Sequence, residues 1–329
     1  MCFLSKYFHL KDLHDIGFEG KRSAINRARR LRKVGNKIPP PFPNGWFSII
    51  ESNQIQPGTA NNVNCLGENF VVFRSLKSKE VFVLDAYCPH MGANLGVGGM
   101  VDGDCIECPF HQWKFRGSDG ACVNIPYSDS LSEIEKSARI KKWKSREVNG
   151  LIFVWHHAEG EEPWEIPVIH EIDNNEWVFH GKNEWSSGEE NKHVASIAMT
   201  HSVKFWKYEF VKVNVTVKQV GPGYVLLFLQ SSFGPLVALQ TVTPVEPLVQ
   251  RLSHYFYGPR YLAWFIKFSL ICETINVARD VMVWNHKQYV SNPLIAKEEK
   301  PIKLFRNWFG QFYSENSKTF ADSNNNLTW

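Results

Sequence analysis

The stretch that decides the fold is CPHMGANLGVGGMVDGDCIECPFH, residues 88–111. Each end of it carries one Cys and one His: Cys88-Pro-His90 opens the stretch and Cys108-Pro-Phe-His111 closes it, with 17 residues between His90 and Cys108. Thiolate sulfur and imidazole nitrogen are common protein ligands of transition metals. The spacing therefore predicts a metal centre held by two short loops that contribute one Cys and one His each.

Two kinds of metal centre use this set of ligands. A Rieske-type [2Fe-2S] cluster has two Cys on one iron and two His on the other, which raises its reduction potential above that of an all-Cys cluster. A Cys2His2 zinc site uses the same side chains, but zinc fingers place the two Cys together and the two His together. The arrangement here favours the Rieske cluster, with Cys88, His90, Cys108 and His111 as its ligands.

The residues around these ligands also suit a cluster. Four glycines are expected to let the backbone approach it closely and donate N–H groups to its sulfurs. They are Gly92, Gly98, Gly99 and Gly103. The remaining cysteines show no metal spacing and are expected to be small buried apolar residues. They are Cys2, Cys65, Cys105, Cys122 and Cys272.

Residues 46–157 resemble the Rieske domain of ring-hydroxylating oxygenases and their relatives. Rieske proteins of the cytochrome bc type carry two more cysteines, whose disulfide braces the cluster, and those positions here are Ala93 and Phe110. A reducing compartment would not keep such a disulfide, so its absence fits an intracellular carrier of the oxygenase type.

The strand and helix patterns predict two folded units after an N-terminal arm, residues 1–40. Short β-rich runs predict an antiparallel Rieske domain over 41–158. Strands followed by helices predict an α+β unit over 159–329, which the resemblance identifies as a truncated helix-grip (START-like) catalytic domain. The strands are expected at 46–50, 70–73, 80–84, 151–155, 176–180, 194–203, 210–219 and 224–229, and the helices at 259–284 and 301–313.

The resemblance implies a mononuclear Fe(II) in the second unit, held by two His and one carboxylate with open positions for dioxygen. Asp280, in the segment Arg279-Asp280-Val-Met-Val-Trp284-Asn285-His286, is the expected catalytic carboxylate ligand. The alternative is an Asp on a helix surface, paired with Arg279 or Lys287.

The two histidines that family members carry four or five residues apart on a helix do not occur in the sequence. His193 and His201 are eight apart and are expected to be polar positions on a sheet. The chain is therefore expected to lack several dozen residues containing the iron-binding helix, at the junction between Glu184 and Trp185. This leaves open whether the chain is active in this form.

Several segments resemble the Neverland-type cholesterol 7-desaturases, which are related to bacterial ketosteroid hydroxylases. They are Thr241–Pro247, Arg279–Tyr289 and Phe305–Phe309. The resemblance implies conversion of cholesterol to 7-dehydrocholesterol in ecdysteroid biosynthesis by a homotrimer. The enzyme's electrons are expected to come from NAD(P)H through a separate reductase. The sequence has no G-x-G-x-x-G turn between a strand and a helix, which is the usual dinucleotide-binding motif. The alternatives are a Rieske electron carrier and a sterol-binding module without turnover.

Composition and charge exclude a disordered chain and indicate what its N-terminal arm could contact. With 43% apolar residues and 12 Trp among 329 residues, a disordered chain is excluded. Residues 1–40 hold 10 Lys/Arg against 3 Asp/Glu, so this arm is basic. It is expected to be solvated or to face an anionic membrane surface, and nucleic acid is not expected.

No secretory signal is visible, and an intracellular protein is expected. Residues Tyr261–Cys272 form the most membrane-like run, but Lys267 interrupts it and it is shorter than the roughly 18 apolar residues that span a bilayer. The sequence therefore predicts no transmembrane segment, although this run could lie against a membrane. The resemblance implies membrane association, and family members carry an N-terminal membrane segment that this chain is expected to lack.

Overall fold

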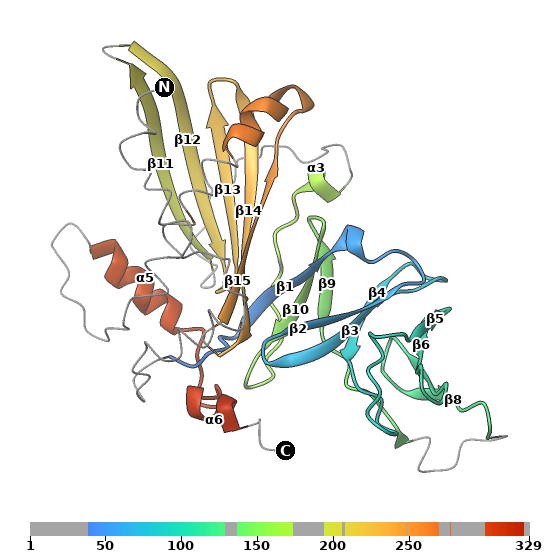
Figure 1. Ribbon diagram of the computed structural model, residues 1–329. Helices are drawn as coiled ribbons and strands as arrows, with labels where there is room; N and C mark the ends of the chain where they lie inside the picture. The colour runs from blue at the N-terminus through green and yellow to red at the C-terminus, as the bar shows by residue number, and fades with distance from the viewer. Residues whose placement is uncertain are drawn as a thin grey trace, which may run out of the picture.

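The computed structural model describes residues 39–128, 137–173, 194–205, 208–247, 249–269, 277 and 300–325. These residues form two regions, which Figure 1 shows side by side. One consists of short strands in small sheets, and the other is dominated by a single sheet of long strands.

The first region contains three small antiparallel sheets, with strand orders β1-β10-β9, β2-β3-β4 and β5-β6-β7-β8. The strands are β1 (Gly45–Glu51), β2 (Ala60–Cys65), β3 (Glu68–Arg74), β4 (Val81–Asp85), β5 (Met100–Asp102), β6 (Cys105–Glu107), β7 (Lys114–Arg116), β8 (Cys122–Asn124), β9 (Ser145–Val148) and β10 (Leu151–His156). A short 3-10 turn, η2 (Ser52–Gln54), follows β1. The four β-rich runs expected from the sequence are confirmed in β1, β3, β4 and β10.

The second region is a five-stranded antiparallel sheet in which each strand pairs with the next along the chain. Its strands are β11 (Val194–Phe205), β12 (Tyr208–Val220), β13 (Tyr224–Ser231), β14 (Gly234–Glu246) and β15 (Val249–Tyr257). The helical elements are α3 (His170–Asp173), η3 (Arg260–Leu262), the helical residues 263–269, α5 (Lys300–Gly310) and α6 (Phe320–Asn325). We refer to the five-stranded sheet as the long sheet.

The predicted strands at 194–203, 210–219 and 224–229 are confirmed by β11, β12 and β13. The strand expected at 176–180 lies outside the described residues, as does most of the helix expected at 259–284 beyond residue 269. The helix expected at 301–313 is present as α5 and ends earlier, at Gly310.

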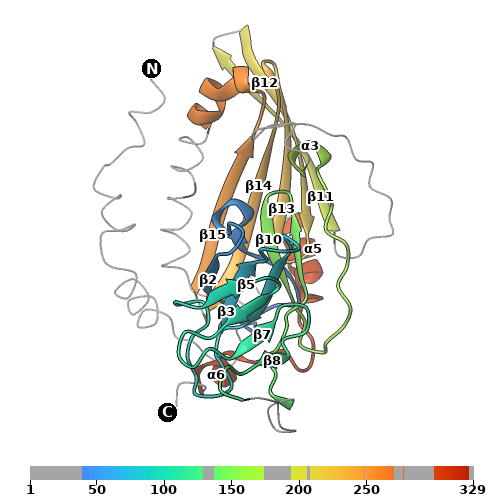
Figure 2. The same ribbon diagram turned by 90° about the vertical axis from the view of Figure 1, so that its right-hand side faces the viewer.

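One hydrophobic core joins the two regions. It combines β1, β9 and β10 side chains with side chains from the long sheet. Its buried members include Trp46, Leu151, Phe153, Tyr224, Val237 and Leu239. The turn between β12 and β13 packs closely against β1. A Cβ atom at Gly223 would lie only 2.7 Å from the Phe47 ring, so this contact requires glycine in the turn. Figure 2, turned by 90°, shows the small sheets in front of the lower part of the long sheet.

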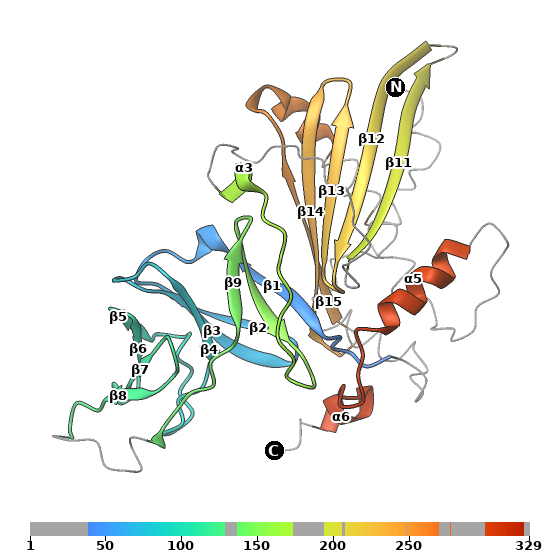
Figure 3. The same ribbon diagram turned by 180° about the vertical axis from the view of Figure 1, so that it is seen from behind.

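The C-terminal segment also ties the regions together. Figure 3 shows α5 beside the lower half of the long sheet and α6 below the sheet. The residues after α5 reach the start of β1, where the Asn44 N–H donates to the Phe312 carbonyl at 2.6 Å. Of the helices in the described ranges, none has the length and apolar character needed to cross a bilayer.

Candidate functional site

The four predicted ligands stand on two loops that share one pattern of backbone hydrogen bonds. The first loop joins β4 to β5 and the second joins β6 to β7. In each loop the N–H of the Cys donates to the carbonyl five residues later, and the N–H four residues later donates back to the Cys carbonyl. The four bonds are Cys88 to Ala93 (2.9 Å), Gly92 to Cys88 (2.9 Å), Cys108 to Trp113 (2.8 Å) and Gln112 to Cys108 (3.0 Å).

Both loops need a left-handed residue at the same point. Gly92 has a φ of 73°, and Gln112, at the equivalent position, has a φ of 60°. Nothing lies within 4 Å of a Cβ atom built on Gly92, so glycine serves the backbone conformation there. At Gly99, by contrast, a Cβ atom would lie 2.1 Å from the Leu95 carbonyl oxygen. At Gly99, glycine is therefore needed because the chain passes close to its own backbone. At Gly92, glycine is needed because the turn requires a left-handed backbone conformation.

The two cysteines form a buried thiol pair. Cys88 and Cys108 are each 2% exposed, and their side chains are within hydrogen-bonding distance of each other. Burial raises the pKa of the Cys88 thiol to about 11, and the adjacent Cys108 adds to the rise while the backbone N–H of His90 opposes it. A bound metal cation reverses this effect, because thiols that coordinate a metal are deprotonated.

The two histidines form a second pair beside the thiols. The ring centroids of His90 and His111 are 4.8 Å apart. Nδ1 of His111 is buried and has no hydrogen-bond partner among the described residues. A buried polar atom without a partner costs about 1–3 kcal/mol, and coordination of a metal would remove this cost. The thiol pair and the imidazole pair therefore fit a [2Fe-2S] cluster.

Aromatic residues that sequence reasoning missed hold the exposed histidine in place. The His90 ring stacks on Trp113, with the centroids 4.6 Å apart and an angle of 5° between the planes. The indole N–H of Trp113 donates to the Tyr127 hydroxyl at 2.7 Å. The only indication in the sequence was that Trp113 follows His111 by two residues, and nothing pointed to Tyr127.

The proposed iron site of the second region is not visible in the structure. Asp280, Arg279 and His193 lie outside the described residues, and His201 is described only as a backbone position of β11, opposite Val213 of β12. Among the described residues of the second region, no three His, Cys, Asp or Glu side chains are grouped as the ligands of one metal ion would be. The four proposed cluster ligands of the first region form two pairs, one for each iron.

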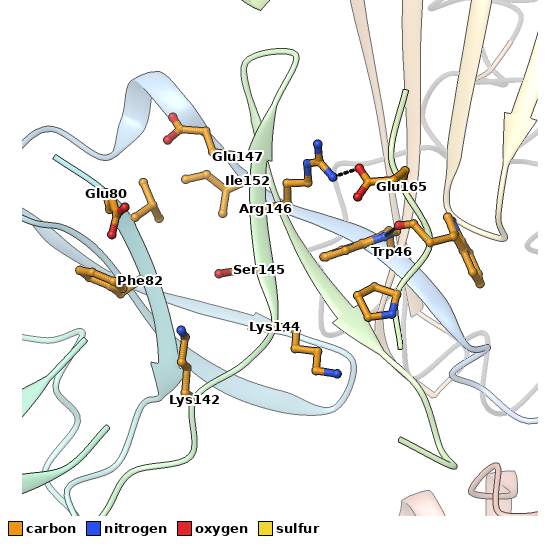
Figure 4. Close-up of a pocket in the computed structure, with 13 residues that line it drawn as sticks. Trp46, Glu80, Phe82, Lys142, Lys144, Ser145, Arg146, Glu147, Ile152 and Glu165 are labelled. Carbon is orange, nitrogen blue, oxygen red and sulfur yellow. Dashed lines mark hydrogen bonds and ion pairs between the residues drawn. The ribbon is translucent and has the colours of Figure 1, made fainter. Parts of the chain in front are cut away.

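A cavity of about 630 Å³ lies between β4 and β9 in the first region (Figure 4). Its wall includes the cations Lys142, Lys144 and Arg146 and the anions Glu80, Glu147 and Glu165, with an ion pair between Arg146 and Glu165. A second cavity, of about 430 Å³, lies between β1 and β15, and its wall is mostly polar. Charged side chains line both cavities, whereas sites for apolar ligands such as sterols are predominantly hydrophobic.

Comparisons with known proteins cover both regions. Residues 45–141 match the Rieske [2Fe-2S] domain, and residues 179–313 match the 3-ketosteroid 9alpha-hydroxylase C-terminal domain. Cholesterol 7-desaturase nvd of Drosophila melanogaster is 42% identical over 365 aligned positions, which cover 94% of this chain and 84% of the relative. Cholesterol 7-desaturase nvd of Xenopus laevis is 38% identical over 382 positions, covering 97% and 83%.

Among solved structures, dicamba monooxygenase with non-heme iron and dicamba superposes with a TM-score of 0.55. The match covers 82% of this chain and 96% of that one at 15% sequence identity, so it shows a shared fold and no more.

Each alignment has more positions than the number of residues of this chain that take part in it. Since 94% of 329 residues is about 309, about 56 of the 365 positions aligned with the Drosophila relative have no counterpart here. For the Xenopus relative, 97% is about 319 residues, so about 63 of 382 positions have none. These numbers agree with the several dozen residues expected to be missing. The identity and coverage also establish the family: the chain belongs to the Rieske oxygenases, in the family of the cholesterol 7-desaturases.

Proposed function

We propose that this protein is the oxygenase component of a sterol desaturase that converts cholesterol to 7-dehydrocholesterol for ecdysteroid synthesis. The observation that carries the proposal is the pair of matching loops, which bring two Cys and two His together in a chain that aligns along most of its length with cholesterol 7-desaturases. The proposal divides the chain into a basic arm (1–40), a Rieske domain (41–158) and a sterol-binding catalytic domain (159–329).

In this proposal Cys88 and Cys108 hold one iron of the cluster, and His90 and His111 hold the other. The bound cluster supplies one-electron transfer. The protein keeps the two sulfurs out of water, since both Cys are buried, while the exposed His90 gives the cluster an edge at the surface. Trp113 fixes the plane of that histidine ring through the stacked contact.

Electrons reach the cluster from NAD(P)H through a separate reductase, because this chain has no dinucleotide-binding turn of its own. A homotrimer and an intracellular, membrane-associated location belong to the same proposal and rest on the family resemblance.

The mononuclear Fe(II) does not fit the residues in hand. Asp280 is the proposed carboxylate ligand, but no two histidines in residues 159–329 stand four or five apart. We therefore assign no step of the reaction to that iron in this chain. We place the missing residues between Glu184 and Trp185, within the segment that the structure leaves undescribed.

The sequence contains all four proposed ligands of the cluster but not the two histidines of the mononuclear iron site. This difference suggests a second candidate function. In the form given by this sequence, the chain is then an electron carrier or a sterol-binding module that does not turn over. The two candidates differ in what happens when the missing segment is supplied.

The test compares two proteins loaded with iron and sulfide. One is this chain, and the other carries the corresponding segment of the Drosophila relative inserted between Glu184 and Trp185. Each is supplied with NADPH, a Rieske-oxygenase reductase, dioxygen and cholesterol, and 7-dehydrocholesterol is measured by mass spectrometry. We expect product only from the chain with the insertion. If that chain binds a further iron and still gives no product, the desaturase proposal is wrong; if the unmodified chain gives product, our placement of the gap is wrong.

A further inference from the structure

The segment after β15 crosses the outer end of the long sheet, far from the cluster loops (Figure 1). It consists of η3 and the helical residues 263–269. The inner face of this helix packs on the sheet, where Phe265 and Ile266 contact a core formed by Leu236, Ala238 and Phe256. The helix is therefore firmly seated on the domain.

The outer face of the same helix is apolar as well. Tyr261, Trp264 and Phe268 follow one another at helical spacing on one side and are 67%, 61% and 57% exposed. Phe233, in the turn between β13 and β14, is 42% exposed and lies beside them. We call Phe233, Tyr261, Trp264 and Phe268 the aromatic tip.

A seated surface helix normally carries polar residues on its outer face, whereas a helix that is apolar all round is typical of burial in protein or membrane. Two rings of the aromatic tip, those of Phe233 and Trp264, pack on each other and on Phe265. The Phe233 centroid lies 5.5 Å from that of Trp264 and 5.2 Å from that of Phe265. Because Phe233 and Trp264 are already packed, these two side chains lose little further conformational freedom when the tip is covered.

The positive charges around the aromatic tip favour a negatively charged binding partner. Arg260 and Lys267 are exposed beside the rings, and residues 249–269 contain no Asp or Glu. Two copies of the chain meeting through this face would bring like charges together. Aromatic rings flanked by cations are suited to the boundary between headgroups and acyl chains, where each well-placed Lys or Arg contributes about 1 kcal/mol on an anionic surface.

We propose that the aromatic tip inserts into the interface of a bilayer containing anionic phospholipid, with Arg260 and Lys267 against the lipid phosphates. This contact goes beyond the proposed desaturation and does not depend on it. It would hold the second region on the membrane by a surface separate from the basic arm of residues 1–40.

The test is flotation of the full chain, loaded with iron and sulfide, with vesicles of phosphatidylcholine containing about 30% phosphatidylserine. Binding is measured at about 0.1 M and about 0.5 M NaCl, because high salt screens the basic arm while leaving apolar insertion in place. The variants are the double substitution Trp264→Ser with Phe268→Ser, and Lys267→Gln. The control is Leu304→Ser in α5, whose side chain is 67% exposed, like that of Tyr261.

We expect the double variant to lose about tenfold or more of its vesicle binding at high salt and Leu304→Ser to keep it within about twofold. Lys267→Gln should weaken binding mainly at low salt. The Rieske spectrum and thermal unfolding of each variant check its fold, and Tyr261→Ser serves as a milder substitution if the double variant does not fold. Wild-type binding by a folded double or single variant overturns the proposal, as does equal loss in Leu304→Ser. A change in sedimentation coefficient with unchanged vesicle binding would instead make the tip a protein interface.

Discussion

The hydroxyl group of Tyr255, in β15, donates a hydrogen bond to the carboxylate of Glu51, in β1, at 3.0 Å. Four residues earlier in β15, the Arg251 guanidinium donates to the Ile49 carbonyl at 2.7 Å. Thr243 of β14 adds a bond from its hydroxyl to the Ser48 carbonyl at 2.7 Å. The long sheet thus holds β1 through the polar side chains of these three residues, beside the shared hydrophobic core. The two regions are therefore expected to unfold together.

Tyr255→Phe should destabilise the joined regions by about 1.5 kcal/mol, because it removes a hydrogen bond to a charged group. Burial raises the pKa of the Tyr255 hydroxyl, which keeps it protonated as a donor. A double-mutant cycle with Glu51→Gln, measured by urea unfolding, should give a coupling energy of the same size. Tyr87→Phe, at an exposed tyrosine, is the control. Additive effects of the two substitutions would mean that the contact does not join the regions.

Cys88→Ser or His111→Ala should abolish the visible absorption and the EPR signal of the cluster, because either change removes one of four ligands. Cys105→Ser is the matched control, since Cys105 lies at the start of β6 and is not one of the proposed ligands. Both spectra are recorded after anaerobic reconstitution with iron and sulfide. Retention of the signal in Cys88→Ser, or its loss in Cys105→Ser, would refute the ligand assignment.

Trp113→Leu should leave the cluster able to form but less well held, because the stacked support of the His90 ring is lost. We expect shifted EPR g-values and faster loss of iron to a chelator, by about tenfold. Tyr127→Phe, which removes the partner of the Trp113 indole N–H, should give a smaller change in the same direction. Identical g-values and release rates in all three proteins would show that the aromatic pair has no part in positioning His90.

The pH dependence of stability should carry a contribution from His156. Burial, together with the nearby charges of Lys141 and Lys318, lowers the pKa of this histidine to about 4. The unfolded chain binds the proton at higher pH than the folded chain, so stability is lost as the pH falls from about 6.5 toward 4. Between pH 7 and pH 5 the loss is about 2 kcal/mol.

His156→Gln removes this titrating group, so its urea unfolding midpoint should fall less between pH 7 and pH 5 than that of the wild type. His170→Gln, at an exposed histidine, should keep the wild-type pH dependence. If His156→Gln and the wild type lose stability in parallel over this range, the explanation through His156 fails.

The elements that could be predicted from the sequence are those whose pattern is long and local. β1, β3, β4 and β10 are apolar runs bounded by turn residues, and the spacing of the four ligands was enough to predict two loops and a metal centre. The strands β5 to β8 have only three residues each, too few to show alternation. In β14, Pro235 and Pro244 argue against a strand, although it lies between β13 and β15 in the long sheet.

Contacts between distant positions could not be predicted at all. Trp113 and Tyr127 meet only because β7 and β8 pair, and Arg251 reaches Ile49 across 202 residues of sequence. Such contacts depend on tertiary packing, which a single sequence does not show. The same holds for the aromatic tip: Tyr261–Cys272 could be identified in the sequence as an apolar run, but the exposure of its rings could not.

The central claim, that Cys88, Cys108, His90 and His111 hold a two-iron cluster, is tested most directly on protein reconstituted with iron and sulfide and labelled with 15N-histidine. Iron and acid-labile sulfide are counted, and the reduced protein is studied by pulsed EPR. We predict two irons and two sulfides per chain for the cluster and nitrogen couplings from two histidines. A colourless protein, uptake of zinc alone, or an EPR signal without histidine nitrogen coupling would contradict the account.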